Sequence, residues 1–327
     1  MREDEIALLA KMRPGLVQLE IGVQTSNPET LKEIRRNMDL DRLEENVAAI
    51  HAGKNIHQHL DLIAGLPYEG YESFGKSFDR VYGMKPEQLQ LGFLKVLKGS
   101  YMHEKANDYG LVYRSNPPYE VLYTNWLSYE DVLRLKKIEE MVELYYNSNQ
   151  FTHTLPILEQ AFESPFALYE SLADFYEEKG YFVNSPARAY RYQVLLDFAT
   201  LKDSGREALY REALTYDMYL RENLKSRPGF AQDLSDKKNI IRCFYQAEEE
   251  NRRYLPGYES YDSKQMSKMT HLDVFKYPVW EMAERKDARI ASGEEKYVLF
   301  DYRERSPLTG DAKTTIVEMP TENAERQ

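Results

Sequence analysis

Three side chains that could do chemistry alternate along one short stretch of the sequence, IHQHLDLIAGLPYEG. They are His57, His59 and Asp61. Alternation places them on one face of a strand, with Leu60 and Leu62 on the opposite, apolar face. Two imidazoles and a carboxylate could bind zinc or another divalent cation, as in a metal-dependent hydrolase. Such a site needs further ligands from other strands, and the remaining histidines fall in expected helices or connections. A metal site is therefore an alternative and not the leading hypothesis.

Two further stretches alternate in the same way and must position this strand. They are LVQLEIGVQ at residues 16–24 and EQLQLGFLKV at residues 87–96. Helical patterns separate the three strands, and one begins at Asn27-Pro28, where Asn caps the helix and Pro takes its first position. Strands joined by helices form βα units, in which the strands run parallel. We therefore expect polar groups at the three carboxyl ends to meet at one edge of a sheet, where α/β proteins bind ligands.

The pattern changes after about Gly110, and Asn116-Pro117-Pro118 breaks the chain. From Ser128 onward the periodicity predicts mainly helices, and two strand-like runs near the end predict a β-hairpin. The predicted domains are an α/β part over 1–115, a helical domain over 116–290, and a hairpin with a frayed tail over 291–327.

Composition excludes several classes of partner. With 42% hydrophobic and 30% charged residues, a packed core is expected. A net charge of -11 argues against nucleic acid as a partner. No apolar run approaches the roughly 18 residues of a membrane helix. The single cysteine, Cys243, excludes an intrachain disulfide, fits a cytoplasmic location, and is expected to be a buried structural thiol.

The strand segments together resemble a known family. LEIGVQTSNPETLKEIRR, HLDLIAGLPYEG and QLQLGFLKVLKGSYMHEKA follow one another as in the second half of the radical S-adenosylmethionine (SAM) barrel. The resemblance covers about residues 4–115. More specifically, the segments are similar to family members that carry a cobalamin (B12)-binding domain and to the oxygen-independent coproporphyrinogen oxidase group. The resemblance implies an α/β fold for this part, a partial TIM-like (β/α) barrel of three parallel strands. The mainly α-helical domain and the β-hairpin that the periodicity predicts would follow it.

The resemblance also implies contacts between the first two strands and SAM. Gln24 would contact the ribose or methionine part, and Asp61 would bond the ribose region. Arg36, expected to close the helix after the first strand, would reach the SAM carboxylate, which suits a guanidinium fork. Ile63 and Gly65 would line the adenine.

On the third strand, the resemblance implies that the backbone around Leu94 and Lys95 lies along the adenine edge. An adenine ring suits an apolar slot with free backbone groups. Neither the substrate nor a catalytic residue is indicated by the sequence.

The sequence departs from the family in one large respect. The family holds a [4Fe–4S] cluster on a Cys-x-x-x-Cys-x-x-Cys loop, and this sequence has one cysteine and no such loop. The strands that precede the resembling segments are missing too. We therefore expect an incomplete radical SAM enzyme, inactive alone, whose cluster and any cobalamin have ligands outside this chain. The partner would be an N-terminal half-barrel on a separate chain. The alternatives are a non-catalytic remnant or partner-binding subunit, and the divalent-metal hydrolase that uses His57, His59 and Asp61.

Overall fold

The computed structural model describes residues 1–281 and 291–320, and the chain divides into two compact units. The first unit comprises Met1–Asn149 and Phe162–Asn184, and the second comprises Gln150–Ala161 and Ser185–Gln327. The helices after residue 116 are therefore shared between the units. The predicted frayed tail lies outside the described residues.

The first unit is built on a three-stranded parallel sheet in the order β1-β2-β3. Its strands are β1 (Gln18–Gln24), β2 (His57–Ala64) and β3 (Gln88–Phe93). The helices before and between them are α1 (Glu3–Leu9), α2 (Pro28–Glu33), α3 (Leu40–His51) and α4 (Tyr71–Gly83). The predicted βα units and parallel strands are thus confirmed.

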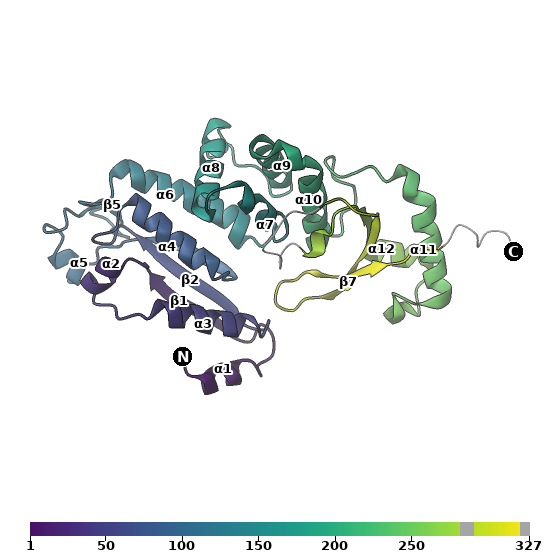
Figure 1. The fold of residues 1–327 in the computed structure, drawn as a ribbon, viewed down its shortest axis with the longest axis horizontal. Helices are drawn as coiled ribbons and strands as arrows, with labels where there is room; N and C mark the ends of the chain where they lie inside the picture. The colour runs from purple at the N-terminus through teal and green to yellow at the C-terminus, as the bar shows by residue number, and fades with distance from the viewer. Residues whose placement is uncertain (282–290, 321–327) are drawn as a thin grey trace. The chain divides into compact units, whose positions relative to one another are not determined.

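The alternation of β2 explains how its two faces differ. Leu60 and Leu62 are fully buried under α3 and α4, which cover one face of the sheet (Figure 1). Burying each leucine stabilises the fold by about 1.5–3 kcal/mol. His57, His59 and Asp61 lie on the other face and are only partly buried. The polar face of the sheet is therefore left open by these helices.

The rest of the first unit follows β3. It contains α5 (Tyr101–Glu104), a small hairpin of β4 (Val112–Tyr113) and β5 (Val121–Tyr123), α6 (Tyr129–Met141), a π-helical turn η1 (Val142–Asn147) and α8 (Pro165–Glu178). Ser128 and Asp131 form a capping box at the start of α6, where the helical periodicity was predicted to begin. The hairpin was not expected from the sequence, although the predicted break at Asn116-Pro117-Pro118 falls in its loop.

The second unit combines helices with an antiparallel sheet in the order β6-β7-β8. The helices are α7 (Thr154–Leu158), α9 (Arg191–Lys202), α10 (Glu207–Arg221), α11 (Lys238–Asn251) and α12 (Ser263–Met269). Short 3-10 turns are η2 (Glu159–Ala161), η3 (Ser204–Arg206), η4 (Ser235–Lys237), η5 (Pro256–Tyr258) and η6 (Val279–Glu281). The strands are β6 (Thr270–Phe275), β7 (Lys296–Arg305) and β8 (Ala312–Val317).

Two predictions for this unit need correction. The C-terminal hairpin exists as β7 and β8, but β6 pairs with β7 and makes the sheet three-stranded. Cys243 on α11 is partly exposed and not buried.

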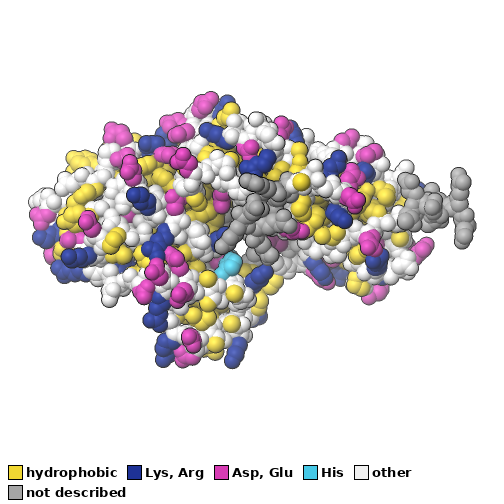
Figure 2. All heavy atoms as spheres, viewed as in Figure 1, with side chains coloured by type: hydrophobic (Ala, Val, Ile, Leu, Met, Phe, Trp, Pro, Cys, Tyr) yellow, Lys and Arg dark blue, Asp and Glu magenta, His cyan; other side chains and the backbone are white. Residues whose placement is uncertain are grey.

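Among the described residues, no helix is both long enough and apolar enough to cross a bilayer. On the face shown in Figure 2, acidic and basic side chains are intermingled.

Candidate functional site

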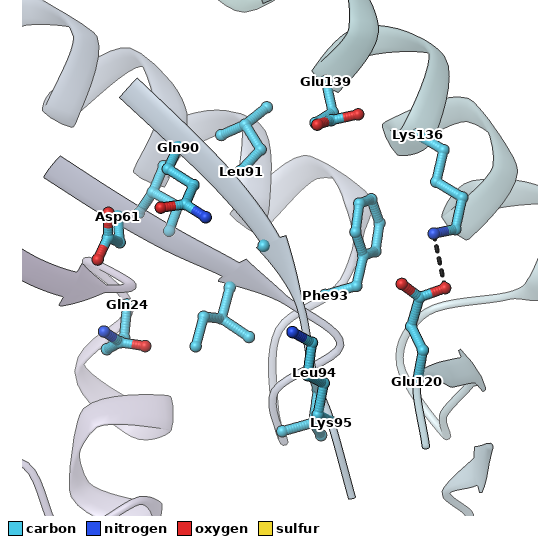
Figure 3. A pocket seen from close by; sticks show the side chains of 13 residues that line it. Gln24, Asp61, Gln90, Leu91, Phe93, Leu94, Lys95, Glu120, Lys136 and Glu139 are labelled. Carbon is cyan, nitrogen blue, oxygen red and sulfur yellow. Dashed lines mark hydrogen bonds and ion pairs between the residues drawn. The ribbon is translucent and has the colours of Figure 1, made fainter. Parts of the chain in front are cut away.

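A cavity of about 610 Å³ lies on the open face of the parallel sheet and continues around β3. Asp61 and Gln90 contribute from the open face, while Glu120 and Lys136 lie beyond the edge of β3 (Figure 3). This volume is within the range of about 300–1,000 Å³ that small-molecule sites occupy. Both the sheet and the segment after it therefore form the walls.

Five of the seven predicted SAM-contact residues line this one cavity. They come from all three strands or the residues just after them: Gln24, Asp61, Ile63, Leu94 and Lys95. The other two, Arg36 and Gly65, do not line it.

The end of β1 is shaped by Gly22 and Gln24. Gln24 has a φ of 73°, and the pairing register shifts between these two residues. The Gln24 side chain folds back so far that a Cβ added at Gly22 would clash with its Nε2. Glycine is thus the residue that lets the Gln24 amide lie over the strand end.

Arg36 lies beside this strand end because α2 stops earlier than expected. The helix ends at Glu33 and not near Arg36, since Arg35 adopts a left-handed φ of 57°. The amides of Arg35 and Arg36 then donate to the carbonyls of Lys32 and Leu31, which is a Schellman ending. The turn sends the Arg36 guanidinium back to the carbonyl of Gly22, to which it donates a hydrogen bond.

Asp61 supplies a carboxylate to the cavity that is not committed elsewhere. It is half-buried and makes no hydrogen bond or ion pair among the described residues. Burial raises its pKa, and the neighbouring charge of Glu20 adds to the effect. A donor such as a ribose hydroxyl would relieve the cost of this partial desolvation.

Gly65 has a packing role. It adopts a φ of +89°, and an added Cβ would lie 2.7 Å from Cγ1 of Val121. The Gly-Leu-Pro turn is therefore covered by β5. Val121 occupies the space into which a side chain at Gly65 would project.

Sequence reasoning missed the wall beyond β3. The Lys136 ammonium donates to Glu120 at 2.7 Å and lies 4.0 Å from the centre of the Phe93 ring. Glu139, one turn further along α6, has a pKa raised by burial and by the charge of Glu143. These residues lie after the break at 116–118, and no pattern in the sequence links them to the strands.

The two histidines of β2 do not form a metal site with Asp61. His57 and His59 are 3.4 Å apart between Nδ1 and Nε2, and Gln18 donates its amide to the other nitrogen of His59 at 3.1 Å. Among the described residues, no group of three or more His, Cys, Asp or Glu side chains is arranged to hold a metal ion. The geometry gives no support to the divalent-metal hydrolase.

An iron–sulfur cluster does not fit the residues of this chain. Cys243 is the single cysteine of the sequence and lies on α11 in the second unit. Clusters of this type are held by several thiolates. Nothing in the described residues supports a cobalamin site either.

The first unit is thus an α/β structure with a ligand-sized cavity along the carboxyl half of a parallel sheet. The model of the family described as "Protein of unknown function (DUF4080)" matches residues 107–300, more than half of the chain. The chain belongs to this family.

A solved structure among those that match shows a distant, partial likeness. It is coproporphyrinogen III oxidase (HemN) from Escherichia coli, described as a radical SAM enzyme, with 28% identity and a TM-score of 0.25. The match covers 28% of this chain and 21% of the enzyme, so the chain spans about a fifth of its length. No curated protein matches the chain.

Proposed function

We propose that the first unit is part of a radical SAM barrel and binds the nucleoside part of SAM in the cavity on its parallel sheet. The observation that carries the proposal is the convergence of Gln24, Asp61, Ile63, Leu94 and Lys95 on one cavity. These residues lie on separate strands, and their assignment came from motif positions alone. The uncommitted Asp61 carboxylate suits the ribose hydroxyls.

Arg36 supports the same assignment although it lies outside the cavity wall. Its guanidinium lies beside Gly22, at 3.6 Å from the position that a Cβ there would take, and the Gln24 amide approaches the same position. In this structure it donates to a backbone carbonyl. A carboxylate would be a stronger acceptor for the same fork, so SAM would compete for it.

Further strands would complete the barrel at β1. The opposite edge of the sheet, at β3, is covered by this chain. Just after β3, the amide of Val96 donates to the carbonyl of Tyr119 at 2.9 Å, and the amide of Val121 donates to the carbonyl of Leu94 at 2.8 Å. In the described part of the chain, β1 pairs with β2 alone. An unpaired strand edge is a template for pairing with another strand. We propose that these strands, and the cysteines of the cluster, come from polypeptide outside these 327 residues.

SAM in such enzymes supplies the radical chemistry once it is bound to a reduced cluster. This chain's own contribution is to hold the nucleoside and orient it through Asp61, Gln24 and the backbone of β3. The full reaction would take place in a reducing compartment such as the cytoplasm, which suits a chain with one cysteine.

Isothermal titration of the full chain with SAM, and separately with adenosine, tests the proposal. Both ligands should bind, because the residues assigned here contact the nucleoside. Asp61→Asn should weaken binding of both by about tenfold, the size of one lost charged hydrogen bond. Gln88→Ala is the matched control, since Gln88 lies on β3 in register with His59 but does not line the cavity.

Two results would contradict the proposal. One is the absence of binding for both ligands at millimolar concentration. The other is an equal effect of Asp61→Asn and Gln88→Ala, which would place any binding elsewhere. Circular dichroism of each variant confirms that the fold is intact.

A partner-binding role without catalysis remains the second candidate, and the unpaired edge of β1 is the observation that favours it. If the chain is a partner-binding subunit only, a strand-supplying partner would bind while Asp61→Asn would leave that binding unchanged and SAM would not bind.

A further inference from the structure

A second cavity, of about 430 Å³, lies wholly within the second unit and within the part of the chain that the family model matches. One wall is a face of α10, a second is the loop at 227–232, and a third is the carboxyl end of β6 with the residues that follow it. None of the residues assigned to SAM contributes to it. This cavity is therefore separate from the SAM site proposed for the first unit.

Three cationic side chains line this cavity: Arg211, Arg227 and Lys276. Two carboxylates, Glu212 and Asp273, also line it, so the lining carries one formal positive charge on a chain whose net charge is -11. The two carboxylates, however, are already engaged by protein donors.

Asp273 is fully buried and saturated with hydrogen bonds. It accepts from the two terminal nitrogens of Arg227 at 2.6 and 3.0 Å, from Nε2 of His271 at 2.9 Å, and from the amide of Val274 at 2.8 Å. Burial alone would raise its pKa, but the hydrogen bonds from His271 and Arg227 outweigh burial and lower it. Asp273 thus acts as an anchor that fixes the Arg227 guanidinium at the cavity wall.

Glu212 is committed in a similar way. One of its oxygens accepts from the amides of Lys276 and Tyr277, both at 2.9 Å, which ties the end of β6 to α10. The carboxylates therefore hold the walls in place and leave the cations as the groups that can respond to a ligand.

Arg211 is held in place and still has donors to offer. Two of its nitrogens donate to Glu207 at 2.8 and 2.6 Å, and the third donates to the carbonyl of Phe230 at 3.1 Å. A guanidinium has five N–H groups, so two are left. The Lys276 ammonium makes no hydrogen bond or ion pair among the described residues. An anion would gain charged hydrogen bonds from Arg211 without a large cost in ordering that side chain, and an added ion pair from Lys276.

The remaining lining is apolar and aromatic. Phe230 lies on the loop wall, while Phe275 and Tyr277 lie on the wall formed by the end of β6. The two phenylalanines are largely buried and Tyr277 is partly exposed. Aromatic walls favour a flat apolar group, by stacking or by edge contacts. The cavity thus offers cations and ring surfaces together.

We propose that this cavity binds a small molecule that carries a carboxylate or phosphate group on a flat apolar body. The oxyanion is held by Arg211, Lys276 and Arg227, and the flat body packs against the aromatic residues. This would be the ligand site of the second unit, and it does not depend on SAM binding by the first unit.

Titration calorimetry of the full chain with phenyl phosphate, benzoate and phenol tests this proposal. Phenyl phosphate or benzoate should bind at least about tenfold more tightly than phenol, and the difference should shrink as salt is added. Arg211→Gln and Lys276→Gln should each weaken binding of the anion by about fivefold to tenfold, with phenol unaffected. Lys264→Gln, on exposed α12 and outside the cavity, is the control and should change nothing.

Three outcomes would overturn the proposal. They are no binding of either anion, equal binding of phenol and phenyl phosphate, and equal affinity of Lys276→Gln and Lys264→Gln for the anion. The Lys276 side chain makes no hydrogen bond with the described residues, so a loss of binding in Lys276→Gln reports on the ligand and not on misfolding.

Discussion

The side-chain amide of Asn147 bonds both backbone groups of Leu89. The Leu89 amide donates to Oδ1 at 2.9 Å, and Nδ2 donates to the Leu89 carbonyl at 2.9 Å. Asn147 thereby takes the place of a neighbouring strand at the outer edge of β3. The π-helical turn η1 carries the side chain to that position. Because this contact and the backbone pairing at Leu94 and Val96 occupy the edge at β3, we propose that further strands pair with β1.

Removing this amide should open the edge of β3. Asn147→Ala leaves two partly buried backbone groups without partners, which should lower the free energy of unfolding by about 1–3 kcal/mol. Hydrogen exchange measured by mass spectrometry should show faster exchange in a peptide that covers β3. Asn147→Asp keeps an acceptor for the Leu89 amide, but it loses the donor that also bonds Glu143 at 2.7 Å and places a second carboxylate beside that residue, so it should destabilise the fold at least as much. Unchanged exchange in Asn147→Ala would contradict the assigned role.

Gly65 and Val121 should show coupled effects on stability. Gly65→Ala has two costs, because the backbone has a φ of +89° and the new Cβ would lie 2.7 Å from the valine methyl. We expect a loss of about 2–4 kcal/mol, of which the left-handed backbone accounts for about 1–2. Val121→Ala removes the methyl group that the new Cβ would meet, but it leaves the cost of the left-handed backbone unchanged. In urea unfolding, the double variant should therefore lose less than the sum of the single variants. Strict additivity would show that the two residues do not pack as described.

The sequence was most informative where the side-chain pattern was regular. Leu60 and Leu62 are buried on one face of β2 while His59 and Asp61 lie on the other, as alternation predicts. In β6 the same rule fails, because Asp273 is buried against Arg227 in the middle of the strand and both faces are covered. A charged residue buried by a partner distant in the sequence cannot be recognised from a local pattern.

The candidate site shows the same division. Gln24 and Asp61 were predicted from strand ends and motif positions. Lys136 and Glu139 were missed, since their place at the cavity depends on how α6 packs beside β3. The end of α2 was also misplaced, because Arg35 takes a left-handed conformation that glycine or asparagine usually adopts.

A buried carboxyl next to the site should make stability depend on pH. Oε1 of Glu69 accepts from the hydroxyls of Thr25 and Ser77 at 2.6 and 2.8 Å, while Oε2 is buried and has no hydrogen-bond partner among the described residues. Burial raises its pKa despite these hydrogen bonds. The folded state therefore holds the proton more tightly than the unfolded state, in which glutamate titrates near about pH 4.3. The resulting stability is fully present below that pH and is lost as the pH rises through the raised value.

Glu69→Gln tests this dependence because it keeps the acceptor oxygen and cannot ionise. In urea unfolding between about pH 4 and pH 8, the variant should gain stability relative to the natural chain as the pH rises. Glu69→Ala should instead lose about 1–3 kcal/mol, because the Thr25 and Ser77 hydroxyls would be left without their acceptor. A constant difference between Glu69→Gln and the natural chain across this range would show that Glu69 is ionised in the folded state.

The pair of His51 and Glu87 should give a pH dependence in the neutral range. Nδ1 of His51 lies 3.2 Å from Oε1 of Glu87, whose other oxygen accepts from the amide of Gln58 at 2.8 Å. The hydrogen bond and charge of Glu87 raise the pKa of His51, while burial and the charges of Lys54 and Lys85 act against this rise. Because the folded pKa is raised, the pair contributes stability that is fully present below the unfolded value of about 6.5 and is lost as the pH rises through the folded value. The contribution should stay below about 1 kcal/mol, since the His51 side chain is half exposed.

In urea unfolding, His51→Gln should be less stable than the natural chain at about pH 6 and equal to it at about pH 8.5, after correction for a pH-independent offset. His51→Gln made in a Glu87→Gln background should show no such change with pH, since the partner charge is gone. A pH-dependent difference that persists in that background would mean that the raised pKa of His51 has another cause.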